Sequence, residues 1–205
     1  MGARKLWAKD GKGKWDMDFA QKLVDTYRQE WADKVPALWE GLQEASIKCI
    51  YDGTPQTYND IEYRLEDAWL TCRLPSGRKL YYFNPQKVTR EMPWSTEERP
   101  DHRRSWTYTA MKSGRLMTVD AYGGLLTENV VQATARDLLY DRALAADANG
   151  YPVLLTVHDE MITEPLANRA NDKELEEIMC DTPEWARSIG IPVAAECWVG
   201  ERYRK

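Results

Sequence analysis

The chain has 205 residues, 43% of them hydrophobic, which is enough for one compact domain with a buried core, or for one domain and a small appendage. No apolar run approaches the roughly 20 residues that a membrane-spanning helix needs, and the basic start MGARKLWAKDGKGKW lacks the apolar stretch of a signal peptide. We therefore expect a cytoplasmic protein without a membrane partner, and the formal net charge of −5 by itself disfavours nucleic acid.

The charged residues are unevenly distributed. Basic residues outnumber acidic ones in the first 14 residues and over 73–115, whereas acidic residues dominate 137–184. Such a split suits a protein that holds a phosphate backbone on one side and metal cations at another point, and it suits ordinary surface charge equally well. The four cysteines lie far apart without a CxxC pair or zinc-site spacing, so we expect reduced, structural thiols.

Two helices are predicted near the N-terminus. Apolar residues recur at helical spacing over 16–31, where Asp16 or Asp18 can cap the first turn. A second helix is predicted over 33–50, because its apolar residues share one face and Pro36 falls in the first turn, where proline is tolerated. The N-terminal part of the chain is therefore expected to be helical.

A β-hairpin and an irregular segment are predicted next. The β-rich runs AWLTCRL and RKLYYF flank Pro75-Ser76-Gly77, a short turn sequence, and this arrangement predicts a hairpin. The stretch 84–118 is rich in Pro, Trp, Arg and Glu and shows no clear period. We expect it to be a long irregular insertion with a strand or two.

The strongest helical pattern in the chain covers residues 127–148. Thr127 is a favourable N-cap, and the alanines and leucines that follow are strong helix formers. One apolar stripe runs along the predicted helix, made of Val131, Ala135, Leu138 and Leu139. Gly150 ends the helix, so the next element begins at Tyr151-Pro152.

A strand–turn–strand and three short elements complete the chain. The apolar run 153–157 predicts a strand that leads into His158-Asp159-Glu160, and the following MIT predicts a second strand. Two short helices are predicted over 172–180 and 183–189, and a final strand over 191–199. The C-terminal third is therefore expected to mix helices and strands.

The His158-Asp159-Glu160 junction is the most informative feature. Hairpin turns prefer Gly or Asn, so Asp-Glu is a poor choice for a turn alone. A carboxylate at the end of a strand suits Mg²⁺, which takes one or two carboxylates together with phosphates and water. Taken by itself, however, the tripeptide fits solvated turn residues and an ordinary packed histidine better than a metal site.

The order of these features resembles the C-terminal part of family A DNA polymerases, the polymerase I type, and its phage members above all. In that family a helix with a Q-x-x-x-x-D pattern, here Gln132 and Asp137, precedes the strand–turn–strand called motif C, here Val157-His158-Asp159-Glu160. RLPSGRKLYYFNP resembles the family's hairpin between fingers and palm, and FAQKLVDTYRQEWADKVPALWEGLQEA is similar to the helix pair after its nucleotide-binding fingers helix. Single-subunit RNA polymerases usually carry His-Asp-Ser at motif C, so Glu160 favours a DNA polymerase.

The resemblance implies an α+β fold, a polymerase palm with an antiparallel sheet and a long packing helix, preceded by helices of the fingers. Three parts are expected: 1–58 as the helical C-terminal part of the fingers, 59–126 as the β-hairpin with the irregular insertion, and 127–205 as the palm with motif C. The bacterial or phage-infected host cell is the expected setting.

The resemblance also implies a two-metal site that binds Mg²⁺, takes dNTP and primer-template DNA, and extends the primer 3′-hydroxyl. Asp159 is then a metal ligand and Glu160 stands beside it, so both are the expected catalytic and metal-binding residues. Gln132 is expected in the minor groove, where an amide can contact the edge of any base pair.

Four further residues are expected to bind DNA on the strength of the resemblance: His158, Asn129, Arg78 and Lys79. Other roles stay open from the residues themselves. Gln132 also fits an ordinary polar surface position, and Asn129 fits a residue that satisfies backbone groups at a helix start. Arg78 and Lys79 also fit solvated charges at a turn.

Two family motifs have no counterpart in the sequence. We find neither the D-x-S-x-x-E-like motif A nor the fingers helix R-x-x-x-K-x-x-x-x-G-x-x-Y-G of motif B, and MGARKLW resembles the residues that directly follow motif B. Because two-metal catalysis needs both aspartates, we expect an inactive isolated chain that is completed by a second polymerase fragment carrying motifs A and B. The alternatives are a non-catalytic DNA-binding remnant and a metal-dependent nuclease built on Asp159 and Glu160.

Overall fold

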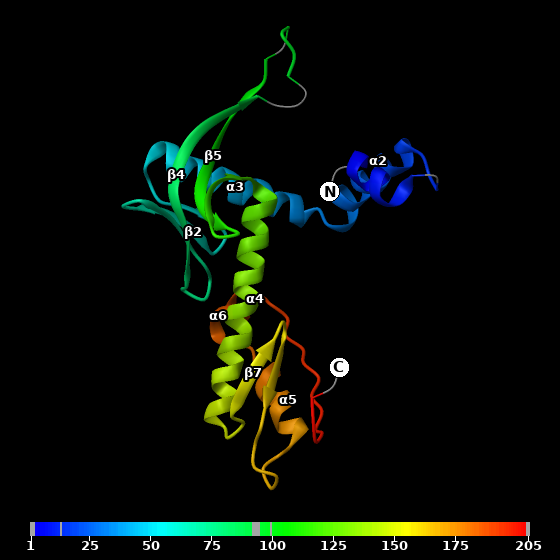
Figure 1. Cartoon of the computed structure of the whole chain (residues 1–205), viewed down its shortest axis with the longest axis vertical. Coiled ribbons are helices and arrows are strands. Elements are labelled where there is room, and N and C mark those ends of the chain that lie inside the picture. The colour runs from blue at the N-terminus through cyan, green and yellow to red at the C-terminus, as the bar shows by residue number, and fades with distance from the viewer. Residues whose placement is uncertain (1–2, 13, 92–94, 99, 204–205) are drawn as a thin grey trace.

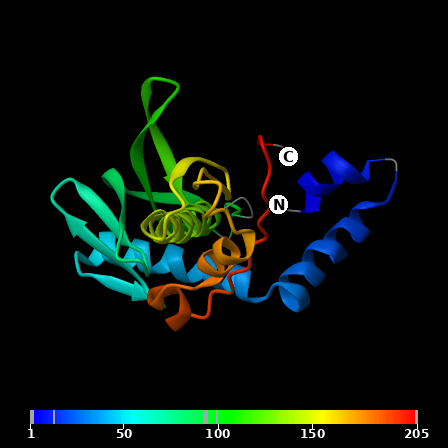
Figure 2. The ribbon, with the colours of Figure 1, turned by 90° about the horizontal axis from the view of Figure 1, so that it is seen from below.

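A computed structural model of the chain describes residues 3–12, 14–91, 95–98 and 100–203. The long helix α4 (Gly123–Ala148) runs from a β-sheet at one end of the molecule to a small C-terminal module at the other (Figure 1). This C-terminal module consists of the elements that follow α4, namely β7 (Val153–Val157), β8 (Glu160–Thr163), α5 (Asp172–Cys180) and α6 (Glu184–Ser188). The N-terminal helices extend to one side of the sheet (Figure 2). The expected α+β class, with N-terminal helices and a long helix packed against an antiparallel sheet, is confirmed.

The remaining elements follow in chain order. The other helices are α1 (Ala3–Leu6), η1 (Trp7–Gly11), α2 (Met17–Thr26), η2 (Tyr27–Trp31), α3 (Lys34–Asp52), α5 (Asp172–Cys180) and α6 (Glu184–Ser188), of which η1 and η2 are π-helical turns. The strands are β1 (Gln56–Tyr58), β2 (Ile61–Glu66), β3 (Trp69–Arg73), β4 (Lys79–Glu91), β5 (His102–Lys112), β6 (Arg115–Ala121), β7 (Val153–Val157) and β8 (Glu160–Thr163). No helix in the described ranges is both long enough and apolar enough to cross a bilayer.

The two predicted N-terminal helices are present. Asp16 caps α2 as expected, because its carboxylate accepts a hydrogen bond of 2.8 Å from the backbone N–H of Phe19. The helical pattern predicted up to residue 31 ends as regular α-helix at Thr26 and continues as the π-helical turn η2. The second helix, α3, starts next to Asp33 and reaches Asp52, where Gly53 in the left-handed conformation ends it.

Strands β1 to β6 form one antiparallel sheet in sequential order. The predicted hairpin is β3–β4, closed by a hydrogen bond of 2.8 Å from Leu74 N–H to the Arg78 carbonyl. The prediction of an irregular segment over 84–118 is wrong, since most of it lies in β4, β5 and β6. The sequence pattern of this segment does not indicate strands for two reasons. A bulge between Phe83 and Gln86 shifts the alternation of the side chains, and the outer parts of the strands are exposed on both faces. Residues 92–94 and 99 of that segment lie outside the described residues.

The hydrophobic core lies between the sheet, α3 and the first half of α4. Tyr82 and Trp106 meet edge to face with ring centroids 5.5 Å apart, a favourable aromatic geometry. The indole N–H of Trp106 donates to the Ser46 hydroxyl at 3.0 Å, so the one polar atom of this ring is satisfied inside the core. Leu126, Val130 and Ala133 are the contribution of α4.

Helix α4 begins at Gly123, four residues before the predicted N-cap. A Cβ at Gly123 would stand 2.3 Å from the Trp39 carbonyl oxygen, so only glycine allows this close approach of α4 to α3. The Gly123 N–H donates to the Gln43 side chain at 2.8 Å, which satisfies a free donor of the first turn. The prediction of Thr127 as N-cap is wrong, because this residue is buried within the helix and the N-cap is Tyr122.

The predicted apolar stripe of α4 does not form one buried face. Val131 is 54% exposed and Ala135 is exposed as well, whereas Leu138 and Leu139 are only partly buried. The buried residues follow different faces in the two halves of the helix: Gly123, Leu126, Thr127, Val130 and Ala133, then Arg142, Ala143 and Ala146. The reason is that the first half packs on the sheet with α3, and the second half packs on the C-terminal module.

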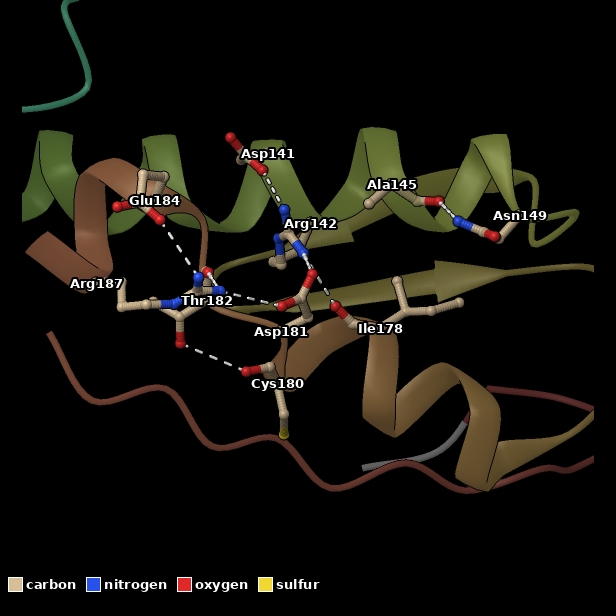
Figure 3. A network of polar contacts seen from close by, with 10 residues as sticks. All are labelled: Asp141, Arg142, Ala145, Asn149, Ile178, Cys180, Asp181, Thr182, Glu184 and Arg187. Carbon is tan, nitrogen blue, oxygen red and sulfur yellow. Dashed lines mark hydrogen bonds and ion pairs between the residues drawn. The ribbon is translucent and has the colours of Figure 1, made fainter.

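A network of ion pairs attaches that module to α4. Arg142 is almost completely buried and pairs with Asp141 at 2.5 Å and with Asp181, beyond α5, at 3.2 Å (Figure 3). Arg187 of α6 pairs with the same Asp181 and donates to the Thr182 carbonyl at 2.7 Å. Both short helices are where the sequence predicts them.

The strand predicted over 191–199 is not a strand in this structure. Residues 191–197 alternate between partly buried and exposed, as an extended segment does, but no described residue pairs with them in a ladder. A strand requires a hydrogen-bonded neighbour, so the prediction of a strand over 191–199 is wrong.

Candidate functional site

The candidate site is the turn between β7 and β8. Val157 pairs with Glu160, so His158 and Asp159 form a two-residue turn and Glu160 opens β8. The predicted hairpin at these residues is confirmed. His158 has a φ of +56°, a left-handed conformation that costs a non-glycine residue about 1–2 kcal/mol.

The two acidic residues of the turn have different surroundings. Asp159 is exposed, and its carboxylate makes no hydrogen bond or ion pair with any described residue. Glu160 is partly buried and accepts a hydrogen bond of 2.8 Å from the Tyr203 hydroxyl. This hydrogen bond raises the pKa of Tyr203 above its ordinary value. The C-terminal segment therefore holds Glu160 and leaves Asp159 open to a ligand.

The carboxylates fit a magnesium ion in chemistry but not in number. Asp159 and Glu160 offer the hard oxygen ligands that Mg²⁺ prefers, and the ion usually keeps water and phosphate oxygens in the remaining positions. Within the described ranges no group of three or more His, Cys, Asp or Glu side chains is placed to hold a metal. The turn can thus supply one or two ligands, and the others must come from outside these residues.

Helix α4 places polar and basic side chains beside β7. Gln132 and Arg136 are one turn apart on its exposed side, and Tyr140 follows one turn later. The Tyr140 hydroxyl lies 3.5 Å from the Thr156 hydroxyl of β7, and the Arg136 guanidinium lies 5.1 Å from the Tyr140 ring centre. The contact with Thr156, and then the Arg136 charge, lower the pKa of Tyr140. This side of α4 therefore presents a cation next to the strand that carries the candidate site.

Gln132 is available for a ligand, whereas Asn129 has a partner in the fold. The Gln132 amide is exposed, and its one hydrogen bond among the described residues is a contact of 3.3 Å with Glu128 on the same helix. The Asn129 amide donates to the Tyr82 hydroxyl at 3.2 Å and so ties α4 to the sheet. This contact is a structural role that the helix pattern alone does not indicate.

Arg78 and Lys79 both lie in ion pairs. The Arg78 guanidinium contacts the Asp137 carboxylate at 2.5 Å and donates to the Ala133 carbonyl at 2.9 Å, and the Ser76 hydroxyl donates to the same carboxylate. We call this contact between the β3–β4 turn and α4 the turn latch. Lys79 pairs with Glu66 across the sheet at 2.7 Å. Asp137, the second letter of the Q-x-x-x-x-D pattern, thus has a structural partner.

Two residues near the site were not found from the sequence. Tyr203 follows Glu160 by 43 positions, and no motif joins the two. Arg136 lies within the recognised helix, and its spacing of four residues from Gln132 and from Tyr140 is a signal that could have marked it.

Comparison with known proteins gives one informative match. No protein-family profile matches the chain, and no solved structure matches it. A DNA polymerase of Bacillus phage SP02 is 31% identical over 174 residues, which cover 84% of this chain. This chain is related to a phage DNA polymerase. It spans about a quarter, 25%, of the length of that relative, so the relation is to one part of a polymerase.

Proposed function

We propose that the chain forms the C-terminal part of a family A DNA polymerase and contributes Asp159 to a two-metal nucleotidyl-transfer site. The observation that carries the proposal is the β7–β8 turn, which leaves the Asp159 carboxylate without a partner among the described residues, in a chain related to a phage DNA polymerase. We assign 1–58 to the end of the fingers, 59–126 to an inserted sheet, and 127–205 to the palm with motif C.

Each side chain of the site has a role in this proposal. Asp159 would give a carboxylate oxygen to the metal, and Glu160, which accepts a hydrogen bond from Tyr203, would keep a second carboxylate beside it. Bound Mg²⁺ would activate the primer 3′-hydroxyl and neutralise charge on the triphosphate. The positive charge of Arg136 favours phosphate near β7, and the exposed Gln132 amide can donate to and accept from base-pair edges in the minor groove.

Three further residues are proposed to contact the DNA backbone: His158, Arg78 and Lys79. The His158 imidazole is exposed at the turn and can donate to the DNA backbone. Arg78 and Lys79 can meet phosphates only in competition with their carboxylate partners, Asp137 and Glu66. Primer-template DNA and dNTP are the proposed substrates, and positioning with electrostatic stabilisation is the proposed source of rate.

Polypeptide beyond these 205 residues is proposed to complete the site, namely a fragment with motifs A and B. Leu154 and Leu155 of β7 and Leu144 of α4 are exposed, although such residues are usually buried. A two-stranded sheet is marginally stable in water unless it packs against something else. A module with so much exposed apolar surface fits one that packs against further chain, and the relative supplies about three quarters of its length outside the match.

The decisive experiment measures primer extension after the chain is mixed with a fragment that carries motifs A and B. We expect no extension by the chain alone and Mg²⁺-dependent extension by the mixture. Asp159→Asn keeps the shape of the side chain and removes its charge, so it should lower the rate about a thousandfold or more. Glu160→Gln should cost less, and Asp147→Asn, at an exposed position near the end of α4, is the matched control.

An Asp159→Asn mixture that extends primers within about tenfold of the unmodified one would show that Asp159 is not the catalytic ligand. The second candidate function is a non-catalytic DNA-binding remnant, which the incomplete ligand set of the described residues favours. It predicts DNA binding that Asp159→Asn leaves unchanged and no extension with any added fragment. A nuclease would instead cut DNA in Mg²⁺ without a fragment, and it would need ligands that the described residues do not bring together.

A further inference from the structure

The hairpin of β5 and β6 ends in a tip that the proposed catalytic site does not use. Figure 2 shows this green hairpin standing out from the rest of the molecule. Ser113 and Gly114 form its two-residue turn, and both have positive φ angles, 49° and 75°, as a type I′ turn requires. Because this turn type matches the twist of the two strands, their pairing continues as far as Lys112 and Arg115 at the turn.

Two cations face each other at the tip. Lys112 and Arg115 are directly opposite across the two strands, and both are exposed. Neither forms an ion pair or a hydrogen bond with the side chains that the structure describes. Like charges directly opposite one another destabilise a strand pair. An anion from outside the described chain would remove this repulsion.

Large apolar side chains lie next to the two cations. Met111 and Leu116 are also paired across the strands, and they are 65% and 68% exposed. Met117 is exposed as well, on the opposite face of the ribbon. β6 is an edge strand of the sheet, where exposed apolar residues invite unwanted pairing. Exposed apolar side chains gathered at one place indicate a surface with a partner.

We infer that the β5–β6 tip binds duplex DNA at the point where its two strands part. Met111 and Leu116 cover the exposed face of the last base pair, as apolar side chains do at unstacked base steps. Lys112 and Arg115 lie one pair nearer the turn and leave the ribbon on its other face, and from the end of the hairpin their long side chains reach the phosphates on either side of that base pair. An acidic protein could neutralise the cations, but the end of a duplex presents a flat apolar face between two rows of anions, which matches both features of the tip.

The place of the hairpin in the fold supports DNA as the partner. β6 ends at Ala121 and α4 begins at Gly123, so the hairpin is rooted at the start of the helix that carries Gln132. Gln132 lies about 14 Å along that helix, and the length of β6 allows a reach of about 23 Å. Both distances fit within one turn of B-DNA, which is about 34 Å. The inference rests on the proposed function in taking DNA as the ligand.

The test measures binding by the 205-residue chain, without nucleotide, to a forked DNA and to a continuous duplex of the same sequence. A 2-aminopurine replaces the last paired base of the fork. We expect about tenfold tighter binding to the fork, which is in the range that stacking contacts contribute, and a rise in 2-aminopurine fluorescence. Met111→Ser with Leu116→Ser should abolish the preference and the fluorescence rise but leave the salt dependence unchanged.

The two cations are tested by salt dependence. Lys112→Gln with Arg115→Gln should lower the slope of log affinity against log salt by about 1.5, because each phosphate contact contributes about 0.7–0.9. Lys48→Gln is the matched control, since Lys48 pairs with Glu44 on the surface of α3. Far-UV circular dichroism checks that the variants fold.

Equal affinity of the unmodified chain for fork and duplex overturns the inference, and this measurement depends on no variant. A preference that survives the Met111/Leu116 change, or a slope that survives the Lys112/Arg115 change, overturns it as well. Because no nucleotide is added, a failure here leaves the role of Asp159 untouched. The result of the Asp159→Asn experiment, whether or not this variant loses activity, likewise does not change the expected preference for the fork.

Discussion

Replacing Arg78 with alanine should destabilise the fold by about 2 kcal/mol. The Arg78 guanidinium contacts Asp137 at 2.5 Å and the Ala133 carbonyl at 2.9 Å, so it closes the turn latch between the β3–β4 turn and α4. Hydrogen bonds to charged groups contribute about 1.5–3 kcal/mol each. The Arg78 side chain is 41% exposed, which screens the interaction, whereas that of Asp137 is 12% exposed, so we expect the lower part of that range.

A double-mutant cycle separates this contact from other effects of the substitution. Arg78→Ala, Asp137→Ala and the double variant should give a coupling energy of about 1.5 kcal/mol. Arg78→Lys keeps the charge but loses the planar fork that contacts Asp137 and Ala133 together, so it should recover only part of the stability. Urea unfolding followed by circular dichroism measures the unmodified chain and these four variants.

A coupling energy below about 0.5 kcal/mol, which is the range of exposed ion pairs, would refute the prediction that the turn latch stabilises the fold. The salt dependence of DNA binding gives a second check. A slope that falls by about one on Arg78→Ala means that the guanidinium contacts a phosphate, whereas an unchanged slope means that it serves the latch alone.

Three further predictions concern single positions. Thr127→Val should raise the free energy of unfolding by about 1 kcal/mol, because the buried hydroxyl has no hydrogen-bond partner, whereas loss of an N-cap would lower it by about as much. His158→Gly should stabilise the fold by about 1 kcal/mol by relieving the left-handed conformation, and destabilisation would contradict this. Burial raises the pKa of the Cys72 thiol from 9.0 to about 12. The stabilisation that comes from keeping this thiol protonated is therefore complete below about pH 9 and is lost as the pH rises toward 12. Stability should therefore fall above pH 9 by up to about 1.4 kcal/mol per pH unit for this thiol, and Cys72→Val should reduce that fall in urea unfolding at pH 8 to 11.

The sequence predicted those elements whose own periodicity and turn residues determine them. The helix α3, the β3–β4 hairpin and the β7–β8 hairpin each have their own periodicity and turn residues. The start of α4 was missed because Gly123 is a poor helix former. Its place there depends on the close contact with Trp39, which lies 84 positions earlier in the chain and leaves no trace in the helical pattern.

The sheet beyond the first hairpin could not be predicted for a different reason. The strand pattern of β4 changes phase at its bulge, where Asn84 adopts a φ of +51°. β5 and β6 extend past the core, so their side chains face water on both sides and lose the alternation that identifies a strand. Pairing between neighbours, rather than burial of one face, holds these parts of the sheet together.

The candidate site was predictable in its turn and not in its surroundings. Asp159 and Glu160 follow from the strand–turn–strand pattern with the preceding helix. The contact of Glu160 with Tyr203 and the latch between Arg78 and Asp137 join distant parts of the chain, so only the folded structure reveals them. The latch also changes the expectation for Arg78, because a guanidinium already paired with a carboxylate binds phosphate less readily.

The strained backbone at the candidate site supports the proposed role of the turn. Among the residues that the structure describes, five non-glycine residues have positive φ, and four of them, Asn59, Asp67, Asn84 and Ser113, are small polar residues that commonly tolerate this conformation. His158 is the fifth, and a glycine there would form the same turn at a lower conformational cost. Strain of this kind persists where the side chain serves a purpose that the turn alone does not require. The exposed imidazole next to Asp159 supplies such a purpose if it contacts DNA, so His158→Gly should weaken DNA binding while it stabilises the fold. A variant that is more stable and binds DNA unchanged would remove this support.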